Sequence, residues 1–165
     1  MREWKDKDLN TPSHDEIMLA LMDKRLWEIL LTKHKLLPND VKITRVEAEK
    51  PIDTENGMPS RFNKIIGFAD FCIRFPTNES PNGFLLIYCE IKATEPSFGN
   101  VVRQVKKYRV YTHGLCRWLV ISPYKEWEKP LLSQGIYWIS SNEVLEEAKK
   151  LKETQVKSGQ ESEVM

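Results

Sequence analysis

The chain of 165 residues lacks any apolar run long enough to cross a membrane, and no leader with a charged, apolar and small-residue pattern precedes Thr11. A membrane-spanning helix needs about 20 consecutive apolar residues, and a secretory leader needs an apolar core of its own. We therefore expect a cytoplasmic protein without a membrane partner. The sequence also has no internal repeat, which disfavours a repeat architecture.

Cysteine and histidine are both scarce, with three residues of each. Cys72, Cys89 and Cys116 fall within or beside apolar segments, as is typical of reduced thiols in a protein core. Neither the cysteines nor the histidines, among them His14, follow the spacing of a zinc site. We interpret the histidines as surface or helix-end residues.

Excess charge of one sign is absent, because 25 Lys and Arg residues against 24 Asp and Glu residues leave a net charge of +1. A protein that coats nucleic acid by charge alone needs a basic excess over a whole domain, so that class is disfavoured. The composition, 41% hydrophobic and 30% charged, is typical of one globular domain. We expect a charged leader over 1–11, a domain over 12–152 and a disordered tail over 153–165.

Apolar periodicity and turn residues predict helices and strands in the order of an α/β chain, more narrowly α+β. Helical patterns cover 12–37, with a break near Asp23, and 100–112; strand patterns cover 41–52, 65–75, 84–93 and 116–122; a strand over 135–139 and a helix from Asn142 follow. Turn residues over 53–60 and 78–83 favour antiparallel pairing of the strands beside them.

One acidic residue interrupts the apolar strand pattern over 65–75, and that residue is Asp70. A carboxylate in such a strand is disfavoured unless it is paired or bound to a metal. Because successive side chains of a strand point to opposite faces, Asp70 should share a face with Phe68, Cys72 and Arg74. This placement marks Asp70 as a candidate functional residue.

The next strand pattern ends with Glu90, Ile91 and Lys92, and the Glu and Lys side chains share a face. If the two strands are neighbours, Asp70 can converge with this pair at one edge of the sheet. Mg²⁺ prefers oxygen ligands and uses one or two carboxylates beside several waters. We expect Asp70, Glu90 and the carbonyl of Ile91 to hold Mg²⁺, or Mn²⁺ as a substitute, while Lys92 orients or deprotonates a water or holds a phosphate.

The predicted helix over 100–112 places Gln104 and Tyr108 one turn apart on an apolar stripe. An amide and a phenol are costly to bury without a partner, so we expect hydrogen bonds to the carboxylates or to a substrate backbone. The same helix carries a basic strip that either binds nucleic acid or is an ordinary solvated face. The strip consists of Arg103, Lys106, Lys107 and Arg109.

In this order, Asp70, Glu90-Ile91-Lys92 and the pair Gln104 and Tyr108 resemble the PD-(D/E)XK nuclease superfamily, in the branch with a QxxxY element. The resemblance covers roughly residues 12–140, with Ala69 in place of the signature proline. It implies a restriction-endonuclease-like core, α-β-β-β-α-β, with a mixed central sheet flanked by helices. It also implies a Mg²⁺-dependent deoxyribonuclease of restriction, recombination, or mobile-element or viral DNA processing.

Members of this family often add an acidic residue from the first helix. Glu16, behind the helix start at 11–13, resembles the type I restriction branch and is our preferred candidate. Glu28 is the runner-up, and Glu47 and Glu49 alternate along the following strand pattern.

Two functions from different classes remain. The first is a DNA-cutting enzyme, and the alternative is a catalytically inactive DNA-binding or assembly module of the same fold. Each motif alone is ordinary, since a Glu-x-Lys pair at a strand end is also common on surfaces. The filled metal and amine positions favour the enzyme. Expected partners are DNA, a second copy in a homodimer, and a companion helicase, translocase or recombination factor.

Overall fold

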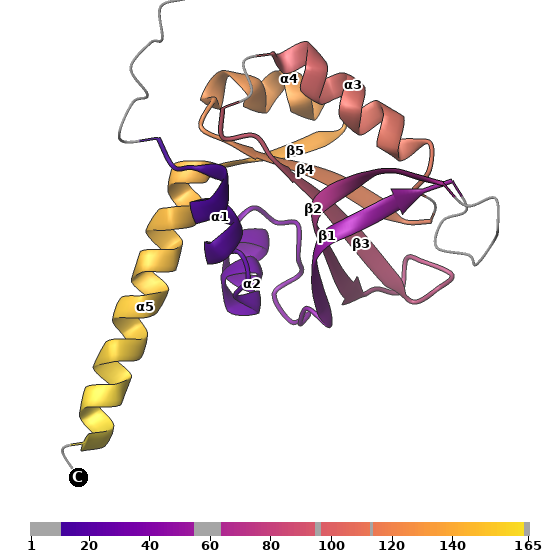
Figure 1. The fold of residues 1–165 in the computed structure, drawn as a ribbon. Helices are drawn as coiled ribbons and strands as arrows, with labels where there is room; N and C mark the ends of the chain where they lie inside the picture. The colour runs from indigo at the N-terminus through magenta and orange to yellow at the C-terminus, as the bar shows by residue number, and fades with distance from the viewer. Residues whose placement is uncertain (1–10, 55–63, 95–96, 113, 164–165) are drawn as a thin grey trace, which may run out of the picture.

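A computed structural model describes residues 11–54, 64–94, 97–112 and 114–163. The chain has an α+β fold with one open sheet of five strands in the order β1-β2-β3-β4-β5 (Figure 1). The strands are β1 (Arg45–Asp53), β2 (Ile65–Pro76), β3 (Phe84–Ile91), β4 (Cys116–Ser122) and β5 (Ile136–Ser140). The helices are α1 (His14–Ala20), α2 (Lys24–Lys33), α3 (Phe98–Arg109), the short 3₁₀ turn η1 (Lys125–Trp127), α4 (Glu128–Ser133) and α5 (Ser141–Glu163).

The sheet is mixed. β1, β2 and β3 form an antiparallel meander, whereas β4 runs parallel to β3, and β5 runs parallel to β4. Parallel neighbours need a crossover connection, which α3 supplies before β4 and α4 supplies before β5. The predicted order of helix, three strands, helix and strand is therefore present, and the strand expected over 135–139 is β5.

The first helical segment divides where the sequence predicts a break. Ser13 caps α1 in a reciprocal capping box, in which its hydroxyl accepts from the Glu16 amide while Glu16 accepts from the Ser13 amide. Asp23 then caps α2 by accepting from the Arg25 amide at 3.0 Å. The two caps fix where His14 and Glu16 sit at the start of the domain.

Helices cover both faces of the sheet (Figure 1). The face under α1, α2 and α5 buries a cluster that includes Trp27, Phe71, Ile73, Ile87, Leu119 and Ile139. The face under α3 and α4 buries a second cluster that includes Tyr88, Val101, Val105, Trp118 and Leu131. Two buried faces explain why β3 and β4 are apolar on both sides in the sequence.

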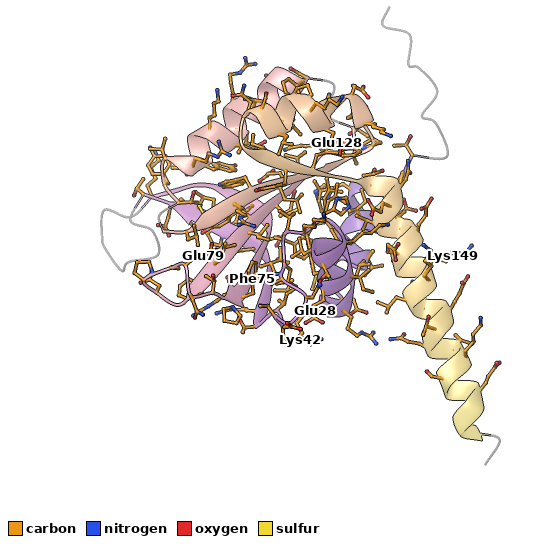
Figure 2. The ribbon with its side chains drawn as sticks, turned by 180° about the vertical axis from the view of Figure 1, so that it is seen from behind. Glu28, Lys42, Phe75, Glu79, Glu128 and Lys149 are labelled. Carbon is orange, nitrogen blue, oxygen red and sulfur yellow. The ribbon has the colours of Figure 1, made fainter. Side chains whose placement is uncertain are left out.

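The C-terminal segment differs from the expectation of a disordered tail over 153–165. Helix α5 continues from Ser141 to Glu163 and extends beyond the body of the domain (Figure 2). Hydrogen bonds propagate from the packed first half of the helix, and each added residue costs little once a helix is nucleated. Most of the predicted leader lies outside the described residues. None of the helices in the described part has the length and apolarity that a bilayer span requires.

Candidate active site

Asp70 lies where the pairing between β2 and β3 ends. The last paired residues at this end are Phe71 and Cys89. Beyond them, Oδ2 of Asp70 accepts a hydrogen bond of 2.7 Å from the backbone N–H of Ile91, 21 residues away in the chain. The carboxylate thus takes a position that a backbone carbonyl would hold in a longer ladder. The structure thereby brings Asp70 against the Glu90-Ile91-Lys92 segment.

The second oxygen of Asp70 contacts His14, which the sequence predicts to be a surface or helix-end residue and which is the first residue of α1. Nε2 of His14 lies 3.2 Å from Oδ1 of Asp70 and donates when that nitrogen carries the proton. The side chains are 45% and 21% exposed, so this contact is open to solvent. The regular alternation of side chains along β2 is interrupted at Asp70. Ala69 and Phe71 would share a face in a regular strand, but Ala69 packs on the α3 side of the sheet and Phe71 packs on the α1 side.

Glu90 is the most deeply buried carboxylate of the site, with 2% of the residue exposed. Its Oε2 lies 3.2 Å from Nζ of Lys92, whereas Oε1 is buried without a hydrogen-bond partner among the described residues. Burial raises the pKa of Glu90 to about 7; the Lys92 ammonium opposes this rise and the Asp70 charge adds to it. Glu90 therefore holds its proton more firmly than an ordinary carboxyl group.

The donor set of the site consists of carboxylate oxygens, which suit a hard divalent cation. The described residues contain no group of three or more His, Cys, Asp and Glu side chains that could hold a metal, which does not fit a zinc centre built from side chains. Mg²⁺ needs only one or two carboxylates because it keeps several waters. The unpartnered Oε1 of Glu90 and the repulsion between Glu90 and Asp70 are the features that a divalent cation would relieve. Asp70 and Glu90 thus fit Mg²⁺ or Mn²⁺.

Gln104 and Tyr108 bind each other instead of the carboxylates. Nε2 of Gln104 donates to the Tyr108 hydroxyl at 3.2 Å. The phenol is buried against Gly67 of β2, where a β-carbon would collide with the hydroxyl. Within the described part of the chain, neither side chain has a recorded hydrogen bond to Asp70 or Glu90. A role toward the substrate backbone stays a prediction.

The predicted basic strip on α3 divides into two kinds of residue. Arg109 donates to the backbone carbonyls of Gln134 at 2.9 Å and Gly135 at 2.6 Å. It therefore fixes the connection between α4 and β5, a structural role that the helix pattern did not indicate. Lys106 and Lys107 are exposed. Arg103 is also exposed and donates to the side chain of Asn100.

The acidic candidates of the first helices have other contacts. Glu16 completes the capping box of α1. Glu28 accepts from the Ile43 amide at 3.3 Å and lies 3.8 Å from Nζ of Lys42, and the labels of these two side chains are neighbours in Figure 2. Among the contacts of the described residues, neither carboxylate meets Asp70 or Glu90. The residue that α1 brings to Asp70 is His14, whose only signal in the sequence is its place directly after the helix cap.

Comparisons with known proteins add no relative. No family model matches the chain, and no curated protein and no solved structure matches it. Two carboxylates, an ammonium and an imidazole meet at one end of the sheet, a set that suits hydrolysis at a phosphate.

Proposed function

We propose that this chain is a metal-dependent deoxyribonuclease of the PD-(D/E)XK type. The observation that carries the proposal is the hydrogen bond of 2.7 Å from the Ile91 amide to Asp70. It joins the acidic residue of one strand to the centre of the Glu90-Ile91-Lys92 segment of the next. The antiparallel pairing of β2 and β3 brings these distant residues together, as the order of the motifs requires.

Asp70 and Glu90 would hold Mg²⁺ or Mn²⁺, with the carbonyl of Ile91 as a further oxygen ligand. When bound, the ion polarises the scissile phosphate and lowers the pKa of the attacking water. The Ile91 amide keeps the Asp70 carboxylate in place from one side. Burial excludes bulk water from Glu90, which strengthens its interaction with any nearby charge.

Lys92 is the group that would orient the attacking water or hold the phosphate. Its side chain is 17% exposed, so the ammonium lies at the border between Glu90 and solvent. Its flexible, compact charge suits a phosphate oxygen as well as a water. His14 lies on the other side of Asp70 and is open to solvent, a position from which it would contact a substrate that approaches the carboxylates.

The arrangement of elements supports the same proposal. A helix, an antiparallel meander, a crossover helix and a parallel strand follow one another, with Asp70 on β2 and Glu90 at the end of β3. The resemblance implies this order for a restriction-endonuclease-like core, and it also expects Gln104 and Tyr108 on the crossover helix, where they lie. We place the activity in restriction, recombination, or mobile-element or viral DNA processing in the cytoplasm, with a companion helicase or translocase as a candidate partner.

The alternative is a non-cutting DNA-binding or assembly module of the same fold. One observation favours it, namely the lack of a three-residue metal group within the described residues. The alternative predicts DNA or partner binding that is indifferent to metal chelation and to a change at Asp70. The proposed enzyme predicts instead that its action on DNA depends on the metal and on Asp70.

A cleavage assay separates the two functions. Linear, branched and single-stranded DNA are incubated with wild-type protein and Mg²⁺ or Mn²⁺, and with Asp70→Asn, Glu90→Gln and Lys92→Gln. The proposal expects cleavage by wild type that each variant and EDTA abolish, while circular dichroism shows a retained fold. Glu128→Gln on α4 is the control, since Glu128 is an exposed carboxylate that is not among the proposed site residues. Inactivity of wild type on all three DNA forms would reject the enzyme.

A further inference from the structure

Two arginines face each other at the end of the sheet opposite to Glu90. Arg45 begins β1, Arg74 lies near the end of β2, and the two are direct partners in the antiparallel pairing. Side chains at such positions project from the same face of the sheet and lie close together. Like charges that face each other across two strands repel each other, so an anion bound beside this pair would be favoured.

Arg74 has no carboxylate partner among the described residues. Its guanidinium carbon instead lies 3.8 Å from the centre of the Phe84 ring. This cation–π contact holds the guanidinium over the ring. A guanidinium can still bind an oxyanion through two N–H groups, with two hydrogen bonds.

The positive charge of Arg45 is only partly neutralised by a neighbouring carboxylate. Its Nε lies 3.7 Å from Oε2 of Glu47, and Nζ of Lys50 lies 3.3 Å from the same oxygen. One carboxylate therefore serves two cations, and Arg74 adds a third positive charge beside them. The group of Arg45, Lys50, Arg74 and Glu47 carries a local excess of positive charge although the whole chain is nearly neutral.

The two arginines line a hollow of about 320 Å³. Asn82 and Phe84 also line this hollow, and the same two residues line a second hollow of about 430 Å³. Tyr88 and Tyr111 line the second hollow together with Glu47, Lys50 and Asp53. The pair of arginines in the first hollow suits a phosphate, and the neighbouring tyrosines suit a planar group attached to it.

We propose that Arg45 and Arg74 form a binding site for a phosphate group, either free or as part of a nucleic acid strand. The anion would offset the positive charge of the facing arginines, and Arg74, held over the Phe84 ring, would supply a pair of N–H donors. The site lies six residues along β3 from Glu90, a separation of about 20 Å in an extended strand. It is therefore a second site, and its existence does not depend on the proposed nuclease activity.

Isothermal titration calorimetry in EDTA tests this site with two probes, inorganic pyrophosphate and a short oligothymidylate. EDTA removes any contribution of metal bound at Asp70 and Glu90. We expect saturable binding to wild type that Arg74→Gln and Arg45→Gln each weaken by about tenfold or more, because a bidentate charged contact is lost. Arg74→Lys should also weaken binding, since an ammonium keeps the charge but not the planar pair of donors.

Arg117→Gln is the matched control. Arg117 on β4 also lies over an aromatic ring, at 5.9 Å from the centre of Tyr137, but its strand position points to the opposite face of the sheet. This variant should bind both probes as wild type does. Binding of pyrophosphate alone identifies a free phosphate ligand, and binding of both probes identifies a nucleic acid contact. No binding to either probe, or an equal loss in Arg117→Gln, would overturn the proposal.

Discussion

The hydroxyl of Tyr108 occupies the space next to Gly67 that a β-carbon would need. Helix α3 therefore lies so close to β2 that only glycine fits beneath the phenol. The contact links the crossover helix to the strand that carries Asp70, three residues further along. The geometry of the candidate site therefore depends on glycine at position 67.

Gly67→Ala should destabilise the fold by about 1–3 kcal/mol, the usual cost of inserting a methyl group into a packed contact. Urea unfolding of the variant measures the free energy change. Gly99→Ala on α3 is the control, because its nearest neighbour would lie 3.6 Å away, at ordinary contact distance, and alanine favours a helix. An equal loss in both variants would contradict the close approach of Tyr108 to β2.

The raised pKa of Glu90 should make the free energy of unfolding fall as the pH rises. Its pKa is about 7 in the folded chain against 4.5 for an ordinary glutamate. Because the folded state holds the proton more firmly, the stability that this group contributes is complete below about pH 4.5 and is lost as the pH rises through about 7. The loss is on the order of 3 kcal/mol.

Glu90→Gln removes this titration, so its free energy of unfolding should exceed that of wild type at pH 8 by more than at pH 4. Denaturant unfolding over this pH range measures the difference between the two proteins. Glu128→Gln should show no such trend, since that side chain is exposed. A difference between wild type and Glu90→Gln that does not change with pH would contradict the raised pKa.

Divalent metal should stabilise the protein in a manner that depends on pH. Mg²⁺ needs the ionised form of Glu90, so below about pH 7 its binding must release a proton, and the apparent affinity falls by up to about tenfold per pH unit. Calorimetry at pH 6 and pH 8 gives both the affinity and the proton release. Asp70→Asn should abolish the effect, and binding that persists in this variant would place the metal elsewhere.

Substitution of Arg109 should lower the stability of the fold, whereas substitution of its neighbours on α3 should weaken DNA binding. Arg109→Gln loses two charged hydrogen bonds to the carbonyls of Gln134 and Gly135, and we expect a stability loss of about 1.5–3 kcal/mol. Lys106→Gln and Lys107→Gln should leave stability unchanged within about 0.5 kcal/mol and weaken DNA binding in low salt. Thermal unfolding and a binding titration for each variant separate the two effects. Equal losses of stability would contradict this division.

Much of the architecture follows from local signals in the sequence. The helix start at 11–13 and the break near Asp23 predict two helices, and the turn residues before Phe84 predict an antiparallel pair. Those two strands place Asp70 near Glu90 and Lys92, because side-chain alternation and strand pairing together define one end of the sheet. The order of the elements was therefore predictable without tertiary information.

Contacts between distant elements were not predictable in the same way. His14 meets Asp70 across 56 residues, and this contact depends on how α1 packs against the sheet. The role of Arg109 depends on where α4 ends, and the pairing of Gln104 with Tyr108 depends on the space above Gly67. Helix periodicity places a residue on a face but does not identify what that face meets.

A crystal soaked in Mn²⁺ tests most directly, through anomalous scattering, whether Asp70 and Glu90 share a divalent cation. We expect one strong peak bound by oxygens of both carboxylates at about 2.1 Å, and no peak there in Asp70→Asn. A soaked wild-type crystal without a peak at this position, with Oε1 of Glu90 still unpartnered, would contradict a shared cation.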